Sequence, residues 1–168
     1  MLAHTDVHKS IYIPFPSSSP TGLSGPLPSD IGLVSALISL DASGDPGLTG
    51  ALPTAWSSLS SLTYLNVSGD SGITGQLPSA WSQITTLIVL DVSHLSVTGT
   101  LPSSWAGLTN LQSLTVNSES NLKGNIPSNW NTLTQLTLLS VSNNNGLTGG
   151  LPSGLWTLNQ IKSLHISG

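Results

Sequence analysis

Two aspartates and one asparagine recur at intervals of 25 residues and come nearest to a catalytic or metal-binding arrangement. Asp41, Asn66 and Asp91 each stand between a leucine and a valine or alanine. If these triplets are neighbouring parallel strands about 4.8 Å apart, the two carboxyl groups lie roughly 10 Å from each other. That separation is near the upper range for an inverting glycosidase pair, and calcium accepts the same oxygens as ligands. An open strand surface has no pocket that could raise the pKa of one carboxyl group, as acid catalysis requires. We therefore interpret the two aspartates as solvated surface acids rather than as a catalytic pair or a metal site.

The aromatic and imidazole side chains offer a second kind of chemistry. Four tryptophans lie three residues after a proline, and the fifth is displaced by one position: Trp56, Trp81, Trp105, Trp130 and Trp156. Their fixed place predicts a ladder inside the core, with each indole N–H bonded in the loops, rather than a row of sugar-stacking platforms. The histidines show no metal-ligand spacing and are interpreted as surface residues: His4, His8, His94 and His165.

Composition excludes several classes of function. Charged residues make up 6% of the 168 positions, arginine is absent, and serine and threonine together supply 47 positions. Nucleic acids and anionic membranes are therefore not expected as partners, because both need clustered cations. The absence of cysteine excludes disulfides and thiolate metal sites. No apolar run has the ~18 residues of a membrane span, and we expect no direct membrane insertion, cofactor or metal.

The elements that would position these residues follow from a repeat. The tetrapeptide Gly-x-Leu/Ile-Pro occurs six times, and its prolines are spaced 25, 25, 24, 25 and 25 residues apart. Proline opens a short helical segment, since its missing N–H would be unpaired there in any case. A leucine-x-aliphatic alternation typical of a strand with one buried face follows each of the six prolines by about a dozen residues, at 40–42, 65–67, 90–92, 114–116, 139–141 and 164–166.

A unit this short cannot bury its own apolar face, so neighbouring units must stack into one continuous core. We therefore predict an α/β solenoid whose strands form a parallel concave sheet and whose proline-tryptophan segments lie on the convex side.

The repeat closely resembles the plant-type leucine-rich repeat, LxxLxxLxLxxNxLxGxIP. The stretch from Leu59 through Leu62, Leu65 and Val67 to Pro78 fits that pattern with one extra residue. The variant with tryptophan after proline is similar to repeats of green algae and kinetoplastid surface antigens. The resemblance implies a right-handed superhelix over 23–168, with about five full units and a truncated last one. Residues 1–22 are interpreted as a cap or degenerate repeat, and further repeats or caps are expected to be missing.

The resemblance also implies an asparagine column whose side chains bond the backbone of adjacent turns. Here that column is mostly lost or replaced by acids, which predicts less rigid loops, and it reads Asp45, Asp70, Leu95, Glu119 and Asn144.

The function implied by the family is non-catalytic binding of a protein, peptide or glycan, in a receptor-like or surface-antigen ectodomain at the cell surface or outside the cell. The predicted contact residues on the concave face are Ser39, Asp41, Tyr64, Asn66, Val89, Asp91, Ser113, Thr115, Leu138, Ser140 and His165. Asn66 also begins a glycosylation sequon. One alternative is a structural or adhesive surface coat. A remote alternative is a glycoside hydrolase-like enzyme using Asp41 and Asp91.

Overall fold

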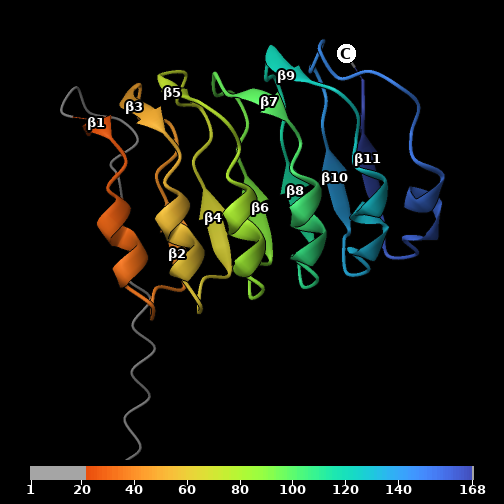
Figure 1. The fold of residues 1–168 in the computed structure, drawn as a ribbon, viewed down its shortest axis with the longest axis horizontal. Helices are drawn as coiled ribbons and strands as arrows, with labels where there is room; N and C mark the ends of the chain where they lie inside the picture. The colour runs from red at the N-terminus through yellow and green to blue at the C-terminus, as the bar shows by residue number, and fades with distance from the viewer. Residues whose placement is uncertain (1–21, 168) are drawn as a thin grey trace, which may run out of the picture.

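The chain folds into a row of stacked coils, and the computed structural model describes residues 22–167 (Figure 1). Each coil contributes a strand to one long sheet, a turn with lateral strand pairing on one edge, and a short 3-10 helix on the opposite face. The segment interpreted as an N-terminal cap, residues 1–22, lies outside the described residues except for Gly22. Within residues 22–167, no helix is long and apolar enough to cross a lipid bilayer.

The long sheet, here called the concave sheet, is entirely parallel. Its order is β11-β10-β8-β6-β4-β2, and adjacent strands pair without a register shift. The central leucine of every strand therefore falls in one row, pointing into the core. The predicted parallel ladder is confirmed, with strands β2 Ser39–Asp41, β4 Tyr64–Asn66, β6 Val89–Asp91, β8 Ser113–Thr115, β10 Leu138–Ser140 and β11 Ser163–His165.

The opposite face carries six 3-10 helices that begin one residue after the repeated prolines. They are η1 Ser29–Leu33, η2 Thr54–Ser58, η3 Ser79–Gln83, η4 Ser103–Gly107, η5 Ser128–Thr132 and η6 Ser153–Thr157. Each proline has an extended ψ that leads the chain into the helix, as its restricted φ allows.

Four tryptophans from these helices form the predicted core ladder. Their rings stack nearly parallel, with centroids 5.9 to 6.5 Å apart and interplanar angles of 5° to 9°. Each indole N–H donates to a proline carbonyl 27 or 28 residues earlier, at 2.9 to 3.1 Å. The ladder comprises Trp56, Trp81, Trp105 and Trp130. Trp156 is 65% exposed, because Leu155 takes the inward position in η6.

Short lateral strands join the coils along a third side. They are β1 Ser24–Pro26, β3 Gly47–Ala51, β5 Ile73–Thr74, β7 Thr98–Thr100 and β9 Asn121–Lys123, all paired in parallel. The repeated glycine in each unit has a positive φ between 79° and 95°, a conformation that side-chain-bearing residues rarely adopt. The glycine of the tetrapeptide is thus required by backbone geometry.

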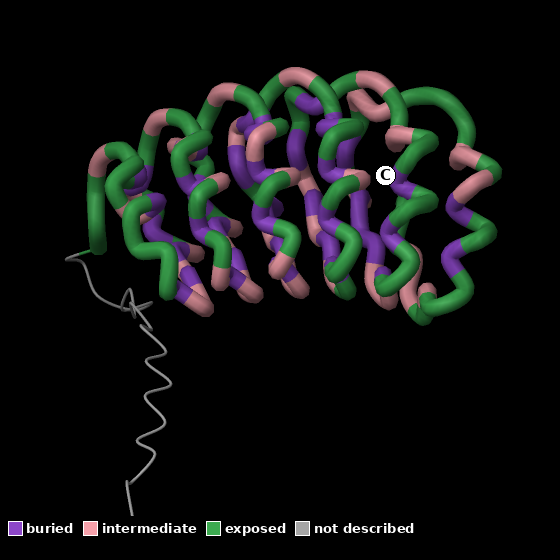
Figure 2. Tube along the Cα trace, turned by 60° about the horizontal axis from the view of Figure 1, so that its bottom comes forward, coloured by how far each residue is buried: buried purple, intermediate pink, exposed green. Residues whose placement is uncertain are grey.

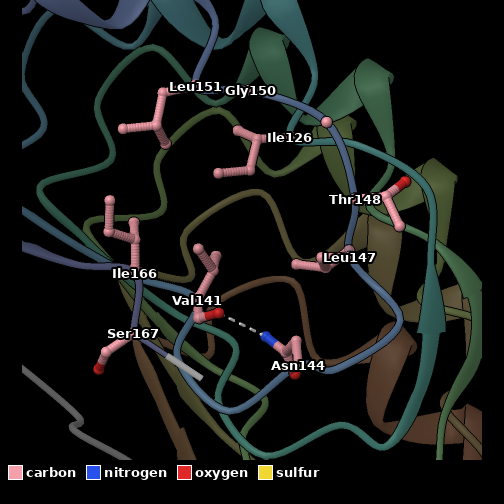
Figure 3. Close-up of a pocket in the computed structure, with 10 residues that line it drawn as sticks. Ile126, Val141, Asn144, Leu147, Thr148, Gly150, Leu151, Ile166 and Ser167 are labelled. Carbon is pink, nitrogen blue, oxygen red and sulfur yellow. Dashed lines mark hydrogen bonds between the residues drawn. The ribbon is translucent and has the colours of Figure 1, made fainter.

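The core runs unbroken along the stack, and Figure 2 shows the buried residues on the inner side of the coils. At the C-terminal end the packing loosens. A cavity of about 230 Å³ opens there beside Val141, Leu147 and Ile166, and Figure 3 shows these side chains around it. A second cavity of about 220 Å³ lies between Leu155, Trp156 and the apolar residues of the last coil.

Candidate ligand-binding surface

The predicted contact residues fall on the concave sheet, where each strand contributes one position on either side of its buried leucine. Nine of the eleven are half-buried, and His165 is exposed. Ser140 is different, because it is only 3% exposed and its hydroxyl donates to the Oδ1 of Asn117 at 2.8 Å. Ser140 therefore offers little surface to a ligand and its hydroxyl supports Asn117, while a contact between Ser140 and a ligand stays a prediction.

The Asp41, Asn66 and Asp91 side chains lie in one row on adjacent strands, as predicted. Each uses its Oδ1 to accept the backbone N–H two residues ahead, at 3.0 to 3.1 Å. These bonds close the turn that leaves each strand, which is the usual work of Asp and Asn at such positions. Among residues 22–167, no three His, Asp or Glu side chains converge as a metal ion would require.

This capping role makes a prediction for Asp91. Replacement by alanine leaves the Ser93 N–H without its acceptor and is expected to cost about 0.5–1.5 kcal/mol in the free energy of unfolding. Replacement by asparagine keeps the acceptor, as Asn66 does for Ser68, and is expected to cost less. Urea unfolding of both variants checks this, and equal losses would contradict the capping role.

The sequon residue Asn66 lies on the concave sheet beside Tyr64. Its Nδ2 donates to the Tyr64 hydroxyl at 3.4 Å, while its Oδ1 accepts from the Ser68 amide. The amide that glycosylation would modify is therefore half-buried on the face predicted to bind.

Beyond the strand ends lies a group of polar residues that sequence reasoning did not place in the site. Asn117 accepts the Ser140 hydroxyl and the Ser142 N–H on its Oδ1, each at 2.8 Å. The Asn117 N–H in turn donates to the Ser93 hydroxyl at 3.0 Å. These bonds join three coils and fix the Asn117 amide in orientation. The signal in the sequence is asparagine at a position that is serine in every other unit.

The side chains of the asparagine column are buried, and two of them still form the ladder that the sequence suggested was mostly lost. Asn144 accepts from the Glu119 N–H at 2.7 Å and donates to the Val116 and Val141 carbonyls. Glu119 accepts the Leu95 N–H at 2.6 Å and the Val97 N–H at 3.3 Å. The glutamate is long enough to reach the previous coil, so it compensates for the leucine in that unit.

The other two acids of the column, Asp45 and Asp70, each have at least one buried carboxyl oxygen without a hydrogen-bond partner among the described residues. Asp70 has no exposed surface, and neither of its carboxyl oxygens has a hydrogen-bond partner of good geometry among the described residues. Burial raises the pKa of Asp70 from its ordinary 3.8 to about 7, while the Asp45 N–H opposes this rise and the Asp45 carboxylate adds to it. Burial also raises the pKa of Glu119 from 4.5 to about 7, although the hydrogen bonds from the Leu95 and Val97 N–H groups lower it in part.

The two described histidines are exposed, as predicted. His94 stands at the edge of the concave sheet with a positive φ of 58°, and His165 ends β11. His4 and His8 lie outside the described residues.

Comparison with known proteins gives matches in structure. No family model matches the chain, and no curated protein matches its sequence. The leucine-rich repeat ectodomain of the Arabidopsis thaliana receptor kinase GASSHO1/SCHENGEN3, solved with CASPARIAN STRIP INTEGRITY FACTOR 2, superposes with a TM-score of 0.80 and 31% identity. That match covers 86% of this chain and 17% of the receptor chain.

Two further Arabidopsis receptor kinases show the same likeness. HAESA, solved with the peptide hormone IDA and the co-receptor SERK1, has a TM-score of 0.80 and 28% identity over 86% of this chain and 24% of its own. The SOBIR1 ectodomain has a TM-score of 0.68 and 29% identity over 76% of this chain and 68% of its own. The chain thus spans about a sixth of the GASSHO1/SCHENGEN3 receptor chain and about a quarter of the HAESA chain. By its fold, this chain is a leucine-rich repeat solenoid of the type found in the ectodomains of plant receptor kinases.

Proposed function

We propose that this chain is a non-catalytic, extracellular recognition segment that binds a peptide or a protein on its concave sheet. The observation that carries the proposal is the row of six parallel strands, which presents half-buried and mostly polar positions on one face. Extended ligands lie well along such surfaces, because each coil offers a contact at a regular interval. The similar ectodomains of GASSHO1/SCHENGEN3 and HAESA, solved with CASPARIAN STRIP INTEGRITY FACTOR 2 and with a peptide hormone, support the peptide reading.

The neutral character of the face supports a ligand with few charges. Asp41 and Asp91 are the only charged side chains among the predicted contact residues, and each already has one oxygen engaged in closing a turn.

Finer assignments belong to the same proposal. The tryptophan variant of the repeat, similar to algal and kinetoplastid repeats, suits a surface-exposed protein. We further propose that 1–22 caps the array formed by 23–168, and that a glycan on Asn66 would cover part of the concave sheet and weaken binding.

The test is a peptide selection with a matched pair of variants. Peptides from a displayed random library are selected on the intact chain, and their dissociation constants are measured. Replacing Ser113 and Thr115 on β8 by glutamate is expected to weaken binding by at least about tenfold, through clash and unpaired buried charge. The same change at exposed Ser103 and Ser128, on the helical face, is expected to leave binding unchanged. Equal affinity for both double variants and the parent would contradict the proposal.

A further inference from the structure

A cavity of about 460 Å³ lies beyond the carboxyl ends of β8, β10 and β11, at the rim of the concave sheet. Its walls carry side-chain amides, hydroxyls and two imidazoles, with an apolar side formed by Leu164 and Ile166. No lysine, acid, tryptophan, tyrosine or phenylalanine of the described residues lines it. The polar lining residues are His94, Asn117, Ser118, Ser140, Ser142, Asn143, His165 and Ser167.

One row of this rim is held in a strained backbone conformation. The equivalent position in the first two coils is glycine, Gly44 and Gly69, with φ of 75° and 89°. The next three coils carry His94, Ser118 and Asn143 there, with φ of 58° to 60°. A Cβ added to Gly44 would meet no atom within 4 Å, and one added to Gly69 would lie 3.4 Å from the Gly44 backbone, so this row has room for side chains. Glycine would adopt this positive φ with less strain than a residue that has a side chain. Strained backbone positions of this kind are typical of ligand sites.

Asn117 presents fixed donors beside this row. Its Oδ1 already accepts the Ser140 hydroxyl and the Ser142 N–H. Because the amide is planar, its Nδ2 must point to the other side, and no described residue accepts from that nitrogen. In the first three coils the turn is closed by Asp41, Asn66 and Asp91 within the coil. The rim of the later coils thus departs from the repeat where the cavity lies.

We propose that this cavity is the specificity site for an extended, uncharged, polar peptide segment. A main-chain carbonyl of the segment accepts from the Asn117 Nδ2, and the Ser118 and Asn143 side chains contact the residues on either side. This proposal rests on the proposed function. It adds which part of the surface sets the specificity and which kind of peptide binds there. A charged segment is disfavoured because the lining offers no oppositely charged side chain of fixed charge. A glycan is disfavoured because the lining has no tryptophan, tyrosine or phenylalanine ring on which a sugar could stack.

The first test replaces Asn117 by aspartate. This change removes both Nδ2 donors and keeps the Oδ1 that holds Ser140 and Ser142, so the rim should stay folded. An uncharged peptide selected on the intact chain is expected to bind at least about tenfold more weakly. Asn121→Asp on the exposed β9 makes the same change of charge away from the cavity and is the control, expected to bind as the parent does.

The second test replaces Ser118 and Asn143 together by glycine. If these side chains serve the ligand, the urea midpoint is expected to stay equal or rise, because glycine relieves the positive φ, while peptide binding falls at least about tenfold. A lower midpoint with unchanged binding would mean that the two side chains serve the fold, and would overturn the site.

Failure of this inference can be told from failure of the proposed function. If binding survives Asn117→Asp but is lost in the Ser113 and Thr115 double variant, the concave sheet binds and this cavity does not. If no selected peptide depends on Ser113 and Thr115, the proposed function itself is wrong. If a neutral oligosaccharide binds and that binding is lost in Asn117→Asp, the cavity is a site but the peptide assignment is overturned.

Discussion

Replacing Trp105 by alanine is expected to lower the free energy of unfolding by about 3–5 kcal/mol. The Trp105 ring has no exposed surface and stacks between Trp81 and Trp130, with each centroid separation 6.5 Å. Its indole N–H donates to the Pro78 carbonyl at 2.9 Å. Truncation therefore leaves a cavity in the middle of the stack and removes one of two donors to the Pro78 carbonyl, which keeps only the Trp81 N–H at 3.2 Å. Both effects destabilise the folded chain.

The matched control is Trp156→Ala, because that ring is 65% exposed and lies outside the ladder. Its effect is expected to stay within about 0.5 kcal/mol, as for most surface substitutions. Urea unfolding of both variants measures the difference. Similar losses at the two positions would mean that the ladder is not what holds neighbouring coils together.

Lowering the pH from 8 to 5 is expected to stabilise the chain. The pKa of Asp70 is raised by burial from 3.8 to about 7 and that of Glu119 from 4.5 to about 7. Between these pairs of values the folded chain holds protons that the unfolded chain has lost, so stability grows as the pH falls through 7 and levels off near pH 4. Each carboxyl can contribute a slope of up to about 1.4 kcal/mol per pH unit in that window.

Asp70→Asn separates this effect from other titrations. Asn144, in the same column, donates to the carbonyl of its own coil and to that of the coil before it. An asparagine at 70 could donate in the same way to the Val67 and Ala42 carbonyls. The variant is therefore expected to be more stable than the parent at pH 8, by about 1–3 kcal/mol, with a shallower dependence on pH. Asp91→Asn on the concave sheet is the control, and equal pH slopes for parent and Asp70→Asn would refute the assignment.

Much of the fold was predictable because each coil repeats the same spacing of leucine, glycine, proline and tryptophan residues. The leucine-x-aliphatic triplets located the six strands of the concave sheet, and their even spacing required a parallel ladder. The proline-tryptophan segments predicted both the helical turns and the buried ladder, since a large apolar side chain at a fixed place in every unit has to face its neighbours. Trp156 shows the limit of the pattern, because a shift of one residue moves the side chain out of the core.

The parts that sequence reasoning missed depend on contacts between coils. Glu119 compensates for Leu95 because a longer side chain reaches the previous turn, and such a replacement is visible only once the two coils are side by side. Ser140 was expected on the open face, but its hydroxyl is drawn under Asn117. The rim cavity was missed for a similar reason, because its strained row has glycine in two coils and three different residues in the others.

The most direct test of the account is a nuclear magnetic resonance titration of the intact chain with a selected peptide. The account predicts that the largest shifts fall on residues of β6, β8 and β10 and on the rim, including the side-chain amide of Asn117. Largest shifts on η3, η4 and η5, with the strand and Asn117 signals unmoved, would contradict recognition by the concave sheet.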